Sequence, residues 1–281
     1  MNKLILSLTL LFFPLTVVLA GPGDTPEELY QSGKRKLESR QYDAAIADFN
    51  KVIDLNKEYA LAYFRRGSAY YLKHDFNKAL RDFDRYVEMK PEDENGYYDR
   101  ALCFKQIGDV QSAINDLGKC LEHNERFTNA MMKRGNMYYE LGRFDSAQQD
   151  FTAYIAVRPD SEKGYYNRGN AYKKQNLHEF ALADFKKVIE INPKFQDVWV
   201  NAGSTLADLG RYAEALPYFN KATQLDPYDG DAFYNVGVVY NNTGRPAEAC
   251  ENFKRGAELN HRDAMKQYMS SCGKAATKSR S

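Results

Sequence analysis

The stretch that decides the fold is residues 128–161, TNAMMKRGNMYYELGRFDSAQQDFTAYIAVRPDS, together with residues 162–195, EKGYYNRGNAYKKQNLHEFALADFKKVIEINPKF. Aligned without gaps, both place glycine, alanine, phenylalanine and proline at positions 8, 20, 24 and 32 of 34. The alanine keeps this 34-residue step along the chain, at Ala45, Ala79, Ala113, Ala147, Ala181, Ala215 and Ala249. A strict period of this length indicates stacked copies of one supersecondary unit.

Each copy predicts two helices. Large side chains at positions 4 and 11 flank the glycine at position 8, which is the spacing of one helix face. Positions 17, 20, 24 and 27 repeat that spacing, and glycine near 15 and proline near 32 favour helix ends. Thr25, Pro26 and Glu28 provide an N-cap, a first-turn proline and a capping-box glutamate. The predicted units are residues 26–59, 60–93, 94–127, 128–161, 162–195, 196–229 and 230–263.

These positions resemble the motif of tetratricopeptide-repeat proteins, over residues 26–263. The resemblance implies an all-α fold, a right-handed α-solenoid of seven helix-turn-helix units with a concave inner face. Residues 264–273, AMKQYMSSCG, predict one further helix that caps the C-terminal end. The third unit departs from the motif, with Ala101, Leu117 and Glu125 in place of glycine, an aromatic residue and proline. We expect a looser junction there.

Positions 2, 5, 9 and 12 of the first helices form a separate stripe, which the resemblance places in the groove. The candidate partner-binding residues are Tyr30, Phe64, Tyr71, Tyr98, Asn136, Tyr139, Lys163, Tyr166, Asn170, Lys173 and Tyr234. Aromatic rings, amides and lysines suit an extended peptide, because rings stack on side chains and amides bond to backbone groups. The alternative for any single tyrosine is packing between neighbouring first helices.

Chaperone-binding members of this family use a carboxylate clamp of lysines, asparagines and an arginine. Asn136 and Asn167 resemble two of the clamp asparagines, and Lys163 resembles one lysine. Met132 and Asn201 stand where a lysine and the arginine are expected. The incomplete clamp does not favour binding of an acidic chaperone tail.

The four cysteines separate into two pairs by helix arithmetic. Cys103 and Cys120 differ in height along their hairpin by about 9 Å, too far for a bridge, and are interpreted as buried small residues. Cys250 and Cys272 differ by only about 3 Å if the last helix folds back. We therefore predict a Cys250–Cys272 disulfide that staples the capping helix to the array; free thiols are the alternative, since the facing of the side chains is not fixed.

The N-terminus has the pattern of a secretory signal. Asn2 and Lys3 precede an uncharged run from 4 to 19, and small residues surround Ala20. We predict a signal peptide at residues 1–20, a short linker at 21–25, and a periplasmic or secreted location without a membrane span after cleavage. An uncleaved membrane anchor is the alternative. Residues 274–281 are predicted to be a disordered basic tail.

Composition and motifs exclude several functions. The 39 basic and 38 acidic residues give a net charge of +1, which favours neither nucleic acid nor an anionic membrane as partner. The sequence contains no nucleophile elbow, phosphate-binding glycine loop or HExxH motif, and its four histidines lack metal-ligand spacing. We therefore expect no enzyme, no cofactor and no metal site.

The first hypothesis is a non-catalytic scaffold or assembly factor that binds protein or an extended peptide in an exported compartment, most economically a bacterial envelope. The alternative is a glycan-binding or substrate-delivery component, because a tyrosine-lined groove can stack sugars. The sequence leaves the partner, the host lineage, the pathway and the oligomeric state undetermined.

Overall fold

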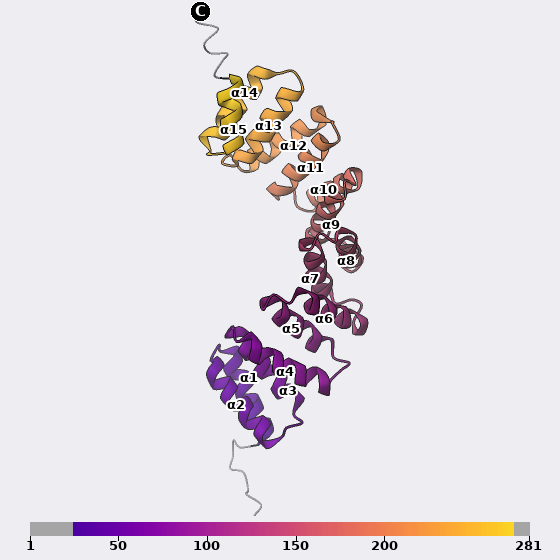
Figure 1. Ribbon diagram of the computed structural model, residues 1–281, viewed down its shortest axis with the longest axis vertical. Helices are drawn as coiled ribbons and strands as arrows, with labels where there is room; N and C mark the ends of the chain where they lie inside the picture. The colour runs from indigo at the N-terminus through magenta and orange to yellow at the C-terminus, as the bar shows by residue number, and fades with distance from the viewer. Residues whose placement is uncertain (1–24, 273–281) are drawn as a thin grey trace, which may run out of the picture. The chain divides into compact units, whose positions relative to one another are not determined.

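The computed structural model of the chain describes residues 25–272 (Figure 1). This range contains fifteen α-helices and one short π-helical segment, and no β-strand is found within it. The boundary between two compact units falls between Glu92 and Asp93, at the start of the third repeat. The predicted signal peptide, residues 21–24 of the linker, and the predicted tail at 274–281 lie outside the described residues.

The first unit consists of two helix hairpins. They are α1 (Pro26–Glu38) with α2 (Tyr42–Leu55), and α3 (Ala60–Leu72) with α4 (Phe76–Met89). Between them, α2 packs against α3. The helix α1 begins at the predicted capping box, in which the Glu28 amide donates to Thr25 Oγ1 at 3.2 Å and the Thr25 amide donates to Glu28 Oε2 at 3.3 Å.

The second unit continues the same pattern with five hairpins. Their helices are α5 (Glu94–Gln106), α6 (Val110–His123), α7 (Thr128–Glu140), α8 (Phe144–Val157), α9 (Glu162–Lys174), α10 (His178–Ile191), α11 (Gln196–Asp208), α12 (Tyr212–Leu225), α13 (Gly230–Asn242) and α14 (Pro246–Glu258). Each second helix packs against the first helix of the next hairpin. The predicted all-α fold of consecutive helix pairs is thus confirmed.

The turn inside each hairpin depends on one residue with a left-handed backbone. At α7, Gly142 has φ of 73°, its amide donates to the Tyr139 carbonyl at 3.0 Å, and the Arg143 amide donates to the Tyr138 carbonyl at 2.8 Å. This pair of bonds satisfies carbonyls at the helix end. Asn176 serves the same purpose after α9, with φ of 59°.

The two helices of a hairpin approach closely at the repeated glycine. A Cβ at Gly135 would lie 2.7 Å from Cε1 of Phe151, and Ala147 between them is fully buried. The third repeat reaches the same contact differently, because Ala101 faces the smaller Leu117 and both are fully buried. In this hairpin alanine replaces the smaller glycine and leucine replaces the larger phenylalanine, so the two changes in side-chain volume compensate each other.

A repeated ion pair, which the sequence analysis did not anticipate, joins the helices of four hairpins. Arg134 donates from Nε to Asp150 Oδ2 at 2.9 Å and from Nη2 to Asp150 Oδ1 at 2.6 Å. The equivalent pairs are Arg66–Asp82, Arg100–Asp116 and Arg168–Asp184. Burial raises the pKa of Asp150, and the paired guanidinium acts in the opposite direction, so the arginine keeps this buried carboxylate ionised.

The described chain ends with α15 (Arg262–Gln267) and the π-helical segment η1 (Tyr268–Cys272), which pack against α14. The predicted capping helix was placed at 264–273, so its start is corrected by two residues. The cause is His261, whose Nδ1 accepts the Ala264 amide at 2.9 Å and caps the helix. Cys250 and Cys272 form a disulfide with their Cα atoms 5.6 Å apart, whereas Cys103 and Cys120 are buried and not bridged.

Candidate functional site

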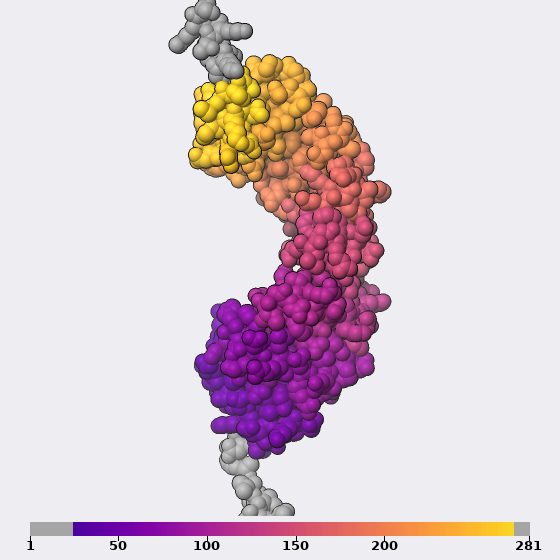
Figure 2. Space-filling model, in the orientation of Figure 1, coloured from indigo at the N-terminus to yellow at the C-terminus, as the bar shows by residue number. Residues whose placement is uncertain are grey.

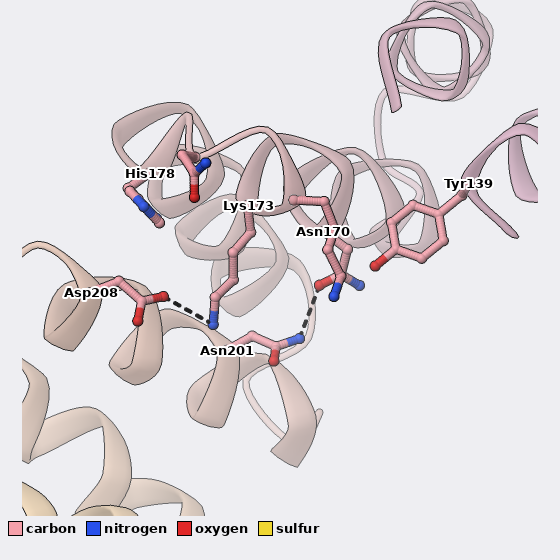
Figure 3. A pocket seen from close by; sticks show the side chains of 8 residues that line it. Tyr139, Asn170, Lys173, His178, Asn201 and Asp208 are labelled. Atoms are coloured by element: carbon pink, nitrogen blue, oxygen red, sulfur yellow. Dashed lines mark hydrogen bonds and ion pairs between the residues drawn. The ribbon is translucent and has the colours of Figure 1, made fainter. Parts of the chain in front are cut away.

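A polar pocket of about 510 Å³ opens on the first helices of the second unit (Figure 3). Its walls come from α7, α9 and α11, with the turn before α10 closing one side. The lining side chains are Tyr139, Asn170, Lys173, Lys174, Asn176, His178, Asn201 and Asp208. Three residues of the predicted stripe, Tyr139, Asn170 and Lys173, therefore lie together.

Asparagine pairs link the first helices that form this pocket. Asn201 of α11 donates from Nδ2 to Asn170 Oδ1 of α9 at 3.2 Å, as the dashed line in Figure 3 shows. One repeat earlier, Asn167 of α9 donates to Asn136 Oδ1 of α7 at 3.2 Å. A smaller cavity of about 50 Å³ lies at this second pair and shares Tyr139 and Asn170 with the larger pocket. The two pairs form one row, called here the amide row: Asn136, Asn167, Asn170 and Asn201.

The amide row leaves hydrogen-bonding capacity unused. Each asparagine side chain has two N–H donors and one carbonyl oxygen with two lone pairs. Within each asparagine pair, a single hydrogen bond joins the two side chains. An extended peptide offers alternating N–H and C=O groups along its length. The Nδ2 groups of Asn167 and Asn201 also donate to Met132 Sδ and to the Tyr166 hydroxyl, both at 3.1 Å. The N–H groups of Asn136 and Asn170 are therefore the donors that could bind a peptide backbone.

Charged groups flank the row at the α9 end. Lys173 Nζ forms an ion pair with Asp208 Oδ2 at 3.4 Å and a hydrogen bond to Ser204 Oγ, which fixes its position in the pocket. Lys174 contributes a second positive charge to the wall. Among residues 25–272, the Nδ1 atom of His178 is buried without a hydrogen-bond partner, although the side chain lines the pocket.

Two tyrosines border the row. In Figure 3 the hydroxyl of Tyr139 points toward Asn170, and its ring packs edge-on against Phe144 with centroids 5.3 Å apart. Burial raises the pKa of Tyr139 above its ordinary value, so the hydroxyl stays a neutral donor. Tyr166 accepts a hydrogen bond from Asn201 Nδ2 at 3.1 Å through its hydroxyl.

The other aromatic residues of the predicted stripe pack mainly within their own 34-residue repeats. Tyr166, Tyr98 and Tyr234 have ring contacts at 5.0 Å or less with Phe195, Phe127 and His261 respectively, and Phe64 contacts Tyr86 at 4.7 Å. The prediction is wrong for Tyr30, which is 7% exposed because its ring fills the space between Phe49 and Tyr59. Tyr30, Phe64 and the half-buried Tyr71 belong to the first unit, and Lys163 is exposed in the first turn of α9.

Sequence reasoning missed part of the site. Asn167 was predicted only as a match to one clamp asparagine, Asn201 only as a departure from the clamp arginine, and neither His178 nor Asp208 was predicted to be a ligand. A signal was present, because Asn167, Asn201 and Asn235 stand at position 6 with the 34-residue step. Among the described residues, no cluster of three His, Cys, Asp or Glu side chains could hold a metal ion. Within residues 25–272, no helix has the length and apolar character to cross a bilayer.

The fold and the pocket define a helical-repeat protein whose first helices present a polar surface. Models of the tetratricopeptide repeat match residues 30–94, 162–195, 196–229 and 218–251, and a further model described as a TPR repeat matches residues 135–176. The chain belongs to the tetratricopeptide-repeat proteins. No curated protein matches it.

Several solved structures are similar to this chain. The C-terminal part of a TPR repeat-containing protein from Cytophaga hutchinsonii has a TM-score of 0.73 at 19% identity, covering 84% of this chain and 98% of that one. YrrB, described as a TPR protein with an unusual peptide-binding site, has a TM-score of 0.58 at 25% identity, covering 66% of this chain and 96% of that one. MamA has a TM-score of 0.57 at 24% identity, covering 61% and 94%. The neighbours at 19% and 24% identity show the same fold, and the family supports a protein-interaction scaffold.

Proposed function

We propose that this chain is a non-catalytic scaffold that binds an extended segment of a partner protein along α7, α9 and α11. The observation that carries the proposal is the amide row, which repeats the same asparagine pair one repeat apart and lines two adjoining cavities. The peptide-binding site named in the description of YrrB supports a peptide as ligand.

The packing of the tyrosines favours a peptide over a glycan. A sugar needs an open ring face to stack on, but the ring of Tyr166 is packed by Phe185 and Phe195, with centroids 6.2 and 4.8 Å away. Tyr234 is packed in the same way by Phe253 and His261. The polar groups that line the pocket are the amides of Asn170, Asn176 and Asn201, two lysines, an imidazole and the carboxylate of Asp208, and the amides suit a peptide backbone.

The test is binding of the chain to an immobilised library of unstructured peptides, followed by measurement of the dissociation constants of the selected peptides. Removing two of the four amides of the row in the N136A/N170A variant should weaken binding by roughly tenfold or more, since each lost amide contributes about 1 kcal/mol. The matched control is Asn115→Ala, an exposed asparagine on the second helix α6, which should bind as the unaltered chain does. Equal binding by N136A/N170A would refute the site, and failure to select any peptide would refute the function.

We further propose that the chain is exported, with residues 1–20 acting as a cleaved signal peptide. The support is the residue pattern alone: a basic start, an uncharged run and small residues before Gly21. Expression of the full chain should give a mature protein that starts at Gly21 in the exported fraction. Leu10→Arg, which places a charge in the apolar run, should leave the uncleaved chain inside the cell. N-terminal sequencing that found Met1 on exported protein would instead identify an anchor.

A further inference from the structure

The C-terminal cap occupies the place of the first helix of an eighth repeat. In the 34-residue frame, Ala264 stands at position 1 and Tyr268 at position 5, the position of Tyr166 and Tyr234 in their repeats. Figure 1 shows α15 lying against α14, which it contacts as each first helix contacts the preceding second helix. In Figure 2 the residues of α13 to η1 form one continuous mass at the yellow end of the colour scale.

This cap has few non-covalent contacts of its own. Of residues 262–272, only Ala264 and Cys272 are buried, and Tyr268 is half-buried. Its start is anchored by His261, which caps α15, lies 3.0 Å from Asp231 Oδ1 through Nε2 and stacks on Tyr234. Its last residue, Cys272, is held to α14 by the disulfide with Cys250. Helices this short are not stable without such anchors.

The cap covers apolar surface on the last complete hairpin. Phe253 and Ala249 of α14 form a cluster with Cys272, and Val238 and Tyr268 pack against that cluster. Close approach is enforced at Gly256, where a Cβ would lie 2.7 Å from the Ala264 Cβ. Without the cap, this surface of α13 and α14 would face solvent.

The disulfide that holds the cap can be reached at Cys250, which is half-buried, whereas Cys272 is buried. Both cysteines line a pocket of about 570 Å³ between α14 and η1, together with Pro246, Ala247 and Tyr268. A thiolate of a dithiol can attack one cysteine sulfur to form a mixed disulfide and release the other cysteine as a thiolate. The second thiol of the reductant then displaces the remaining cysteine, so that two electrons pass from the dithiol to the protein.

We propose that the Cys250–Cys272 disulfide is a redox-sensitive clasp. In the oxidised protein it keeps residues 262–272 on α14 and closes the end of the array. Reduction by a dithiol releases these residues and exposes the apolar surface of Val238, Ala249 and Phe253. The rest of the second unit keeps its fold, because each hairpin is stabilised by contacts with its neighbours.

The experiment compares amide hydrogen exchange of the full chain before and after treatment with dithiothreitol. We expect the amides of residues 262–272 to lose their protection on reduction, with α5 to α12 unchanged. Iodoacetamide should then add two groups, at Cys250 and Cys272, because Cys120 is buried and its pKa is raised to about 12 by that burial. The C250S/C272S variant should show the exchange pattern of the reduced protein without any reductant.

The C103A/C120A variant is the matched control, because it keeps the clasp and lacks the buried thiols. It should respond to dithiothreitol as the unaltered chain does. Unchanged protection of residues 262–272 after complete reduction would overturn the proposal, because the cap would then hold without its staple. Loss of protection throughout α5 to α12 would also overturn it, because the disulfide would then support the whole unit. A disulfide that dithiothreitol does not reduce in the folded protein would refute the accessibility on which the clasp depends.

Discussion

At the scale of single residues, the distance between the helices of a hairpin is set by a glycine and the ring that covers it. Gly135 has no side chain because Phe151 Cε1 occupies the space that a Cβ would need, 2.7 Å away. In the third repeat the methyl group of Ala101 is accommodated because Leu117 is smaller than phenylalanine. The chain thus contains two residue pairs that fit the same helix spacing, glycine with phenylalanine and alanine with leucine. We expect that one pair can replace the other.

Gly135→Ala should lower the free energy of unfolding by about 1–3 kcal/mol, because the added methyl overpacks the contact with Phe151. In a Phe151→Leu background the same substitution should change that free energy by less than about 1 kcal/mol, because the pair then reproduces Ala101 and Leu117. Urea unfolding of the four proteins in this double-mutant cycle gives both values. Equal effects of Gly135→Ala in the two backgrounds would show that the ring does not cause the constraint.

At the scale of the elements, the paired helices are joined by ion pairs whose carboxylates are buried. Asp150 is 5% exposed and relies on the two bonds from Arg134. The sixth repeat has no such pair, because Ala202 and Tyr218 stand at the same positions. Ala202 of α11 is fully buried, and Tyr218 of α12 packs against Trp199 of α11. In this repeat, apolar contacts therefore join the two helices in place of the ion pair.

Arg134→Ala should destabilise the chain by about 3 kcal/mol or more at pH 8, since it leaves a buried carboxylate without a partner. The R134A/D150Y variant, which copies the sixth repeat, should be destabilised less than the single variant. The effect of Arg134→Ala should shrink as the pH falls toward 4. Burial already raises the pKa of Asp150 in the intact protein, and without the guanidinium this pKa rises further, so protonation on acidification removes the unpaired charge. Urea unfolding at pH 8 and pH 4 measures this; an effect independent of pH would contradict the role of the charge.

The sequence predicted the elements well because the pattern that forms them is local. The first helices begin at Pro26, Ala60 and each later step of 34, where the motif places position 1. The apolar positions of the motif do not predict the ion pairs, although the arginines and aspartates keep the same period. The site was predicted in part: the bond from Asn201 to Asn170 depends on how one repeat is rotated on the next, which spacing within a repeat does not determine. Tyr30 occupies the groove position of the motif, but its ring packs within its own repeat, against Phe49 and Tyr59.

At the scale of the whole molecule, stability is distributed over separate cores. Phe49, Val52 and Leu29 form the core of the first unit. In the second unit, one cluster surrounds Leu117 and another surrounds Phe185 and Phe219. Since a repeat protein is stabilised by contacts between neighbouring repeats, damage to one core should remain confined to the hairpins beside it.

Phe151→Ala tests this expectation, because the ring is 1% exposed and lies in the middle of the second unit. The substitution should lower the free energy of unfolding of these helices by about 3–5 kcal/mol. Amides of α7 and α8 should therefore exchange roughly a hundredfold faster or more. Amides of α1 to α3 should keep their rates, because their core contains other residues. The matched variant Phe49→Ala, with an equally buried ring in the first unit, should give the reverse pattern. If either substitution accelerated exchange equally in both units, the chain would unfold as one cooperative body, and the local character of the proposed clasp and of the peptide site would have to be abandoned with it.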